Sequence, residues 1–138
     1  MPSMKSPFGL SVPSLLFLMA LSWGGHAAAQ NSPAGDPAQG KTFFGQNCAL
    51  CHAAAAGVTQ QGPSLAGVVG RRAGSVAGFN YSKALSGSGL TWDAPTLDRF
   101  LTDPGATVPG TTMAVPIPVK QDRDNVIAYF QSLASASK

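Results

Sequence analysis

The sequence has little of what most metal-ion and nucleic-acid sites require. Its 138 residues contain two cysteines, two histidines and no glutamate. Only 11% of the residues are charged, and the lysines and arginines are scattered apart from the adjacent pair Arg71 and Arg72. Nucleic-acid-binding surfaces gather Lys and Arg on one face. We therefore expect no nucleic-acid partner.

Long apolar runs are also scarce. The longest mostly apolar stretch, residues 8–23, is interrupted by Pro13 and is shorter than the roughly 20 residues that a membrane span needs. The segment after it contains Ala27 and Ala29, which are small residues of the kind that a signal peptidase recognises. We expect residues 1–29 to be a secretory signal peptide, with export to the periplasm and no membrane span after cleavage. An uncleaved N-terminal anchor is the alternative.

Cleavage would leave one small domain, residues 30–138. Removing 29 of the 138 residues gives a chain of 109, which is the length of a single domain. The domain is rich in Ala, Gly, Ser and Pro and short of large apolar side chains, and a domain of this size buries only a modest part of its surface. We expect a monomer in which a cofactor supplies part of the core.

The residues left for metal chemistry in this domain are very few. They are Cys48, Cys51, His52 and Met113. The spacing Cys-x-x-Cys-His has four possible explanations, namely a structural disulfide, a dithiol redox pair, half of a zinc site or a covalent haem attachment.

Three of these explanations fit poorly. A structural zinc site needs four Cys or His ligands, and a disulfide between Cys48 and Cys51 would close a very short loop and stabilise little. A thioredoxin-like pair would lie beside a βαβ unit, for which the sequence has no strand-forming runs. The spacing is typical of c-type haem attachment, with a thioether from each cysteine to the haem and His52 as a ligand of the iron.

Met113 is the candidate for the second axial position of the iron. It is the only methionine of residues 30–138 and lies in the Pro- and Gly-containing stretch "VPGTTMAVP", which is typical of a loop rather than a core helix. Ligation by His and Met raises the reduction potential of haem iron. With both positions filled, a substrate has no access to the iron, so we expect one-electron transfer and no enzymatic activity.

These motifs together resemble the class I cytochrome c family, of the bacterial periplasmic and mitochondrial type. The resemblance extends over most of the domain, through "GKTFFGQNCALCH", "GPSLAGVVGRRAG", "GFNYS", "LTWD", "VPGTTM" and "NVIAYF". It implies an all-α cytochrome c fold, with about three main helices, short additional helices and Gly/Pro-rich loops around one covalent haem c. It also places Gly40 and Phe44 where the first and last helices cross.

The resemblance further implies roles for four residues around the haem. The carbonyl group of Pro63 would accept the second N–H of His52, which orients the ring and raises its basicity. Tyr81 and Trp92 stand where the family hydrogen-bonds a haem propionate, and Arg71 matches a nearby arginine.

The sequence departs from the family pattern in two respects. Gly105, Ala106 and Thr112 occupy positions where many members have lysines that dock acidic partners, so weak electrostatic steering is expected. Phe100 stands where many members have a tyrosine whose hydroxyl reaches the methionine sulfur.

Local sequence signals predict where the three main helices lie. Asp36 and Pro37 form a helix start, with a capping side chain followed by proline at the first helical position, and this helix is predicted to run through Cys48. Asp93 is predicted to cap a second helix, which runs through Thr102 and is stopped by Pro104. A third is predicted to begin near residue 120, where apolar residues recur at helical spacing.

The sequence therefore predicts a soluble periplasmic carrier that exchanges electrons with membrane or periplasmic redox proteins. The alternative is a haem-bearing relay subunit of a periplasmic dehydrogenase or oxidase complex. A haem enzyme or gas sensor with an open iron site, and a thiol–disulfide oxidoreductase, are the other hypotheses.

Overall fold

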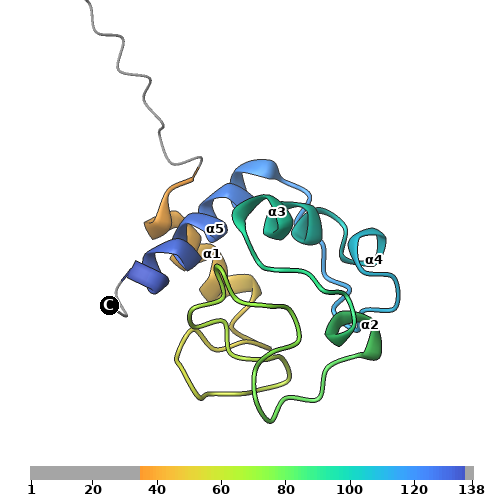
Figure 1. The fold of residues 1–138 in the computed structure, drawn as a ribbon. Helices are drawn as coiled ribbons and strands as arrows, with labels where there is room; N and C mark the ends of the chain where they lie inside the picture. The colour runs from red at the N-terminus through yellow and green to blue at the C-terminus, as the bar shows by residue number, and fades with distance from the viewer. Residues whose placement is uncertain (1–34, 136–138) are drawn as a thin grey trace, which may run out of the picture. The chain divides into compact units, whose positions relative to one another are not determined.

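The computed structural model describes residues 35–135, and regular structure in this part is helical. The helices in chain order are α1 (Pro37–Asn47), α2 (Lys83–Ser86), α3 (Ala94–Thr102), α4 (Pro104–Thr107) and α5 (Lys120–Ser135), as Figure 1 shows. Within the described residues the only β-type pairing recorded is an isolated bridge between Arg72 and Thr91. The predicted all-α fold is thus confirmed. The predicted signal peptide, residues 1–29, lies outside the described residues.

Helix α1 begins as the sequence predicts. The Asp36 carboxylate accepts hydrogen bonds from the backbone N–H groups of Ala38 (2.8 Å) and Gln39 (3.3 Å), and Pro37 occupies the first turn. The helix ends at Asn47, and the Cys48 N–H donates to the Phe44 carbonyl oxygen at 2.8 Å. Cys48 is therefore the C-cap of α1 rather than its last helical residue, one position from the predicted end.

Helices α1 and α5 cross closely at Gly40. A side chain at this position would collide with the Asn125 carbonyl oxygen and the Tyr129 Cβ atom, so glycine is needed for this approach. The Phe44 ring packs beside the contact, with centroid distances of 5.7 Å to Tyr129 and 6.1 Å to Phe130. The crossing that the resemblance places at Gly40 and Phe44 is confirmed.

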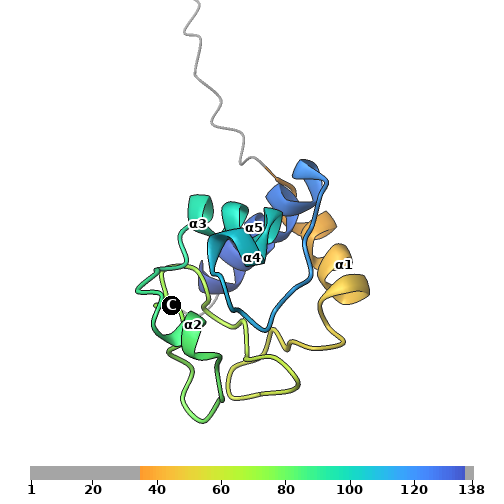
Figure 2. The same cartoon turned by 90° about the vertical axis from the view of Figure 1, so that its right-hand side faces the viewer.

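Helix α3 packs against α5 and leads into α4 (Figure 2). Asp93 caps α3 by accepting the Thr96 N–H at 2.7 Å. The helix ends at Thr102 as predicted, but Pro104 does more than stop it. Asp103 accepts the Ala106 N–H at 2.9 Å, and Pro104 becomes the first residue of α4, because proline is well suited to the first helical position.

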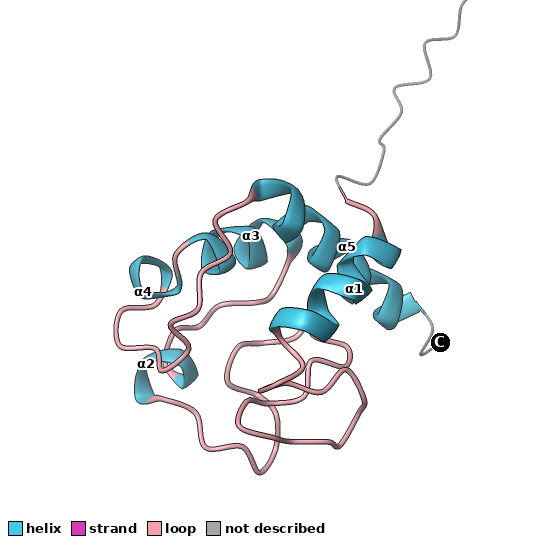
Figure 3. Ribbon diagram, turned by 180° about the vertical axis from the view of Figure 1, so that it is seen from behind, coloured by secondary structure: helices cyan, strands magenta, loops and turns pink. Residues whose placement is uncertain are grey.

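The rest of the described chain is loop, and much of it, from residue 48 to 82, lies on one side of the helices (Figure 3). Backbone hydrogen bonds tie this part to the segment before α3. Gly70 N–H donates to the Trp92 carbonyl oxygen (2.9 Å), and Trp92 N–H donates to the Arg71 carbonyl oxygen (2.9 Å). The loops are therefore fixed to the helical part of the domain on both sides of Arg71.

Candidate functional site

The two cysteines and the histidine lie on one tight turn that leaves α1. The Cys51 and His52 N–H groups both donate to the Cys48 carbonyl oxygen, at 3.0 and 2.9 Å. Both cysteines are free thiols and half-buried, and the Cys51 thiol donates to Gln61 Oε1 at 3.1 Å. Burial, with a smaller contribution from Cys51, raises the pKa of Cys48 to about 11.

His52 is oriented by the segment that follows the turn. Its Nδ1 atom lies 2.8 Å from the Pro63 carbonyl oxygen, which is the contact that the resemblance implies. With its proton on Nδ1, the ring donates to Pro63 and keeps the Nε2 lone pair available for a metal. The segment itself is held by Gly62 N–H donating to the Cys51 carbonyl oxygen (2.6 Å) and by Leu65 N–H donating to Ala53 (2.8 Å).

Gly62 is a residue of this site that the sequence analysis did not single out. A Cβ atom at Gly62 would lie 2.6 Å from His52 Nδ1 and 2.8 Å from its Nε2. These separations are too short for any real side chain. Glycine is therefore required here for the imidazole to lie flat against the backbone. Gly62 directly precedes Pro63, the histidine's acceptor, but nothing in the sequence distinguishes it from the other loop glycines.

Met113 lies on a loop between α4 and α5. The loop begins with Thr111 N–H donating to the Val108 carbonyl oxygen at 3.0 Å, and Met113 N–H then approaches Thr111 Oγ1 at 3.3 Å. Thr112 and Ala114 are exposed, whereas Met113 is half-buried and packs against the hydrophobic core. The loop thus directs its methionine inward.

One hydrophobic cluster connects several of the predicted site residues. Trp92 belongs to the cluster, and Cys48 and Met113 pack against it. Phe100 is also a member, with only 4% of its surface exposed, and its ring centroid lies 4.9 Å from that of Trp92. The buried residues of the cluster are Phe44, Val68, Ala73, Trp92, Leu97, Phe100, Leu101, Val108, Ile117, Val126, Ile127, Tyr129 and Phe130.

Arg71 reaches back to the segment beside Pro63. Its Nη1 and Nη2 atoms donate to the carbonyl oxygens of Ala66 (2.7 Å) and Ser64 (2.8 Å). Its Nε is buried and has no partner among the described residues. Burial also lowers the pKa of Arg71, although the nearby Tyr81 acts in the opposite direction. A buried, unpaired N–H group is costly, so this group is expected to have an acceptor that the described residues do not provide.

The Tyr81 hydroxyl also has hydrogen-bonding capacity to spare. It accepts a bond from the Val76 N–H at 3.3 Å, which leaves its own proton free to donate. An anionic oxygen beside Arg71 and Tyr81 would satisfy both. Propionate groups of a haem have this chemistry. Haem c also requires two thiols for covalent attachment, here Cys48 and Cys51, and iron ligands such as the imidazole of His52 and the thioether of Met113. The residues present therefore fit haem c.

The alternative of a multi-ligand metal-ion site finds no support in the part of the chain that is described. No three His, Cys, Asp or Glu side chains gather there as ligands. No helix in residues 35–135 has the length and apolar character needed to cross a membrane.

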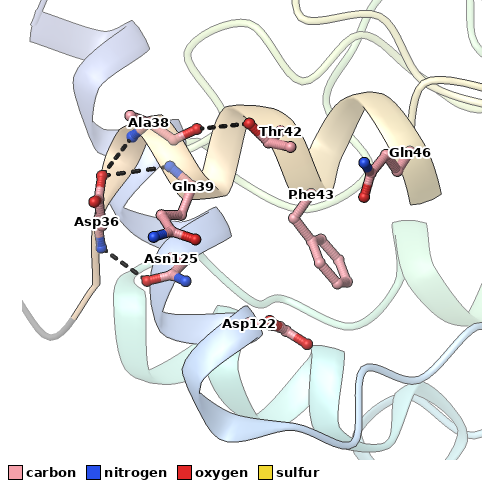
Figure 4. Close-up of a pocket in the computed structure, with 8 residues that line it drawn as sticks. All are labelled: Asp36, Ala38, Gln39, Thr42, Phe43, Gln46, Asp122 and Asn125. Carbon is pink, nitrogen blue, oxygen red and sulfur yellow. Dashed lines mark hydrogen bonds between the residues drawn. The ribbon is translucent and has the colours of Figure 1, made fainter.

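A separate open pocket lies between α1 and the first turns of α5 (Figure 4). The Asp36 N–H donates to Asn125 Oδ1 at 2.8 Å, and the Asp36 carboxylate caps α1. These polar groups serve the contact between the helices, so we assign the pocket no function. Its lining residues are Asp36, Ala38, Gln39, Thr42, Phe43, Gln46, Asp122 and Asn125.

Comparisons with known proteins agree with this chemistry. The family profile for cytochrome c matches residues 37–134. The chain is 49% identical over 116 residues to cytochrome c2 of Rhodomicrobium vannielii, covering 80% of this chain and 86% of that protein. It is 43% identical over 104 residues to cytochrome c2 of Rhodopila globiformis, covering 75% and 98%. The solved structure of cytochrome cH from Methylobacterium extorquens superposes with a TM-score of 0.66, at 42% identity, over 71% of this chain and 99% of the other.

Proposed function

Because the chain belongs to the cytochrome c family, we propose that it is a soluble periplasmic electron carrier with His/Met-ligated haem c. Membership of the family gives the protein its cofactor, a covalently bound haem c with iron. In this proposal Cys48 and Cys51 would hold the haem through two thioethers, and His52 and Met113 would bind the iron.

The contact between His52 and Pro63 is the observation that carries the proposal. The Pro63 carbonyl group holds the imidazole with its second nitrogen free, at 2.8 Å from Nδ1. The ring lies against Gly62, in space that any side chain at that position would occupy. With the proton on Nδ1 donated to Pro63, Nε2 is the nitrogen that would bind iron.

The remaining residues determine what the iron can do. Bound haem c supplies an iron that changes by one electron between its ferric and ferrous states. Met113 would be the second protein ligand of the iron, and its side chain would keep water and small substrates away, which would leave electron transfer as the reaction. Arg71, Tyr81 and Trp92 would hydrogen-bond the propionates. The proposal therefore assigns the protein a carrier function and no enzymatic one.

The proposed location and partners follow from the N-terminal sequence and the relatives. Residues 1–29 have the pattern of a signal peptide, and the relatives include cytochromes c2 of two bacteria. We propose export to the periplasm, a single domain in residues 30–138 and a monomeric state. The partners would be redox proteins of the periplasm or the membrane.

Four measurements on the protein purified from the periplasm test this proposal. The pigment should stay with the chain in denaturing electrophoresis and acid–acetone extraction, and Cys48→Ser with Cys51→Ser should remove it. The reduced protein should bind CO slowly and elute from gel filtration as a monomer. Rapid CO binding would indicate an open iron site. Elution only in a larger complex would favour the relay subunit.

A further inference from the structure

The loop that carries Met113 has a second anchor, which lies after the methionine. Arg123 of α5 is buried, with 7% of its surface exposed. Its Nη1 atom donates to the carbonyl oxygens of Ile117 (2.9 Å) and Pro118 (3.0 Å). One side chain of the last helix therefore binds two successive carbonyl groups of the loop.

The same guanidinium group is bound on its other side to α3. Arg123 Nε donates to Asp98 Oδ1 at 2.7 Å, and the Asp98 side chain is 35% exposed while that of Arg123 is 8% exposed. Helix α3 also holds the loop directly, because the Ile117 N–H donates to the Leu101 carbonyl oxygen at 2.7 Å. The loop, α3 and α5 thus meet at one guanidinium group.

This anchor bears on where Met113 lies. Between Met113 and Ile117 the chain runs through three exposed residues, 114–116, and Val115 is 62% exposed. Exposed residues make few packing contacts that could fix the backbone. The position of the methionine therefore depends on the loop ends, which are Thr111 on one side and Ile117 on the other.

A buried guanidinium group needs both a counter-charge and hydrogen-bond acceptors. Asp98 provides the charge, and the loop carbonyl groups provide the acceptors. Loss of Asp98 would leave the Arg123 charge unpaired. Loss of Arg123 would leave the Ile117 and Pro118 carbonyl oxygens without this donor, so the second end of the loop would be held only by the bond from Ile117 N–H to Leu101.

We propose that Arg123 and Asp98 form a positioning pair, which keeps the Met113 loop closed on α3 and α5 and so holds the thioether at the iron. This inference rests on the proposed ligation by Met113. Neither side chain is assigned contact with the cofactor, and both act through the loop backbone.

Imidazole competition with Met113 tests the pair in the ferric holoprotein. Imidazole replaces a loosely held methionine more readily, so the sulfur-to-iron charge-transfer band disappears at lower imidazole concentration. We expect Arg123→Gln to raise the apparent imidazole affinity at least about tenfold, which corresponds to about 1.4 kcal/mol. The near-isosteric Asp98→Asn should raise the apparent imidazole affinity by a smaller factor, about threefold. It removes the counter-charge of Arg123 but leaves the bonds from Arg123 to the loop carbonyl groups possible.

Two control variants on α5 separate positioning from general stability. Lys120→Gln removes an ion pair to Asp124 in which the lysine is 68% exposed, and it should leave the imidazole affinity unchanged. Val126→Ala makes a cavity at a side chain that is 1% exposed, and it should lower the free energy of unfolding with little effect on imidazole affinity.

The outcomes distinguish the pair from the ligation itself. If Val126→Ala raises the imidazole affinity as much as Arg123→Gln, the pair is only structural and the proposal is wrong. If Arg123→Gln fails to assemble, Asp98→Asn alone decides, and an unchanged affinity overturns the proposal. A wild-type protein without the charge-transfer band would instead overturn ligation by Met113.

Discussion

The α1–α5 crossing and the loops around the candidate site are stabilised by different kinds of interaction. At the crossing, Gly40 lets two backbones approach, and Phe44 packs on aromatic side chains of α5. In the loops, two arginines bind backbone carbonyl groups. Arg71 binds those of residues 64 and 66 beside Pro63, and Arg123 binds those of residues 117 and 118 after Met113.

This difference shows how one small domain can hold His52 and Met113, the proposed iron ligands, on irregular segments. The crossing needs apolar fit, whereas each loop needs polar atoms at defined places. Arg71, which is half-buried, serves the histidine side, and Arg123, which is buried, serves the methionine side. A change at the crossing should therefore lower the free energy of unfolding of the whole domain. A change in the loops should mainly alter the ligation and midpoint potential of the iron.

Substitution of Gly40 by alanine should have the largest effect. The methyl group would collide with the Asn125 carbonyl oxygen, and backbone cannot move aside as a flexible side chain can. We expect a loss in the free energy of unfolding at or above the roughly 1–3 kcal/mol typical of overpacking. Guanidinium unfolding followed by far-UV circular dichroism measures it.

Gly45→Ala is the matched control on the same helix. An added Cβ there meets nothing within 4 Å, and alanine has the higher helix propensity. This variant should therefore be as stable as the wild type or more stable, by up to about 1 kcal/mol. Equal losses in the two variants would contradict the role assigned to the crossing.

Gly62→Ala should act on the iron ligand as well as on stability. The methyl group would push the imidazole of His52 away from Pro63 and weaken the bond that makes the ring a strong donor. A weaker donor favours the ferrous state, so the midpoint potential should rise by tens of millivolts, where roughly 59 mV is tenfold for one electron. Spectroelectrochemical titration measures the shift.

Gly105→Ala serves as the control for that experiment. A Cβ at Gly105 of α4 would meet only Asp103 Oδ1, at the ordinary contact distance of 3.6 Å. Its potential should match that of the wild type. A Gly62→Ala protein with unchanged potential would show that the ring tolerates a methyl group.

Phe100→Tyr should produce a smaller rise in the potential. A hydroxyl donating to the Met113 sulfur would withdraw electron density and make the sulfur a poorer donor to ferric iron. The new group must find this partner, because an unsatisfied buried hydroxyl costs about 1–3 kcal/mol. Phe130→Tyr, at the α1–α5 crossing, places a hydroxyl in an equally buried position (3% exposed against 4%) and should leave the potential unchanged. Equal potentials in all three proteins would remove Phe100 from the tuning residues.

Asp93→Asn should have the smallest effect, confined to acid pH. Hydrogen bonds from Thr96 hold the pKa of Asp93 below its usual range. This carboxylate therefore stabilises the fold above the unfolded-state pKa near 3.9, and the stabilisation is lost as pH falls through the lower folded-state value. Asparagine caps helices as well as aspartate, so the variant should match the wild type at pH 7 and lose less stability on acidification. Unfolding midpoints of the wild type and the variant, measured at pH 7 and again at a pH below the unfolded-state pKa near 3.9, compare the two proteins.

Local signals were sufficient to predict the three main helices, but not the short helices α2 and α4. Capping by Asp36 and Asp93 and the start of α5 near residue 120 were all predicted from short stretches of sequence. The prediction was incomplete at Pro104, because Asp103 caps a new short helix there. A proline that ends one helix can equally begin another, and its effect depends on the capping residue before it.

The contacts that tie the loops could not be predicted in the same way. Asp98 and Arg123 are 25 residues apart, and no spacing rule connects them. Gly62 looks like any other loop glycine until the imidazole is seen against it. The site residues could be proposed from the family resemblance. The polar groups that position them could not, because their contacts depend on how the backbone packs.

The most direct test of the account is the visible and near-infrared spectrum of the ferric protein and its Met113→Ala variant. The account predicts a weak sulfur-to-iron charge-transfer band in the wild type. It also predicts that Met113→Ala loses this band, binds CO once reduced and has a lower midpoint potential. A wild-type spectrum without the band, or a variant with the same spectrum as the wild type, would contradict ligation by Met113 and with it the proposal of a closed, electron-carrying haem.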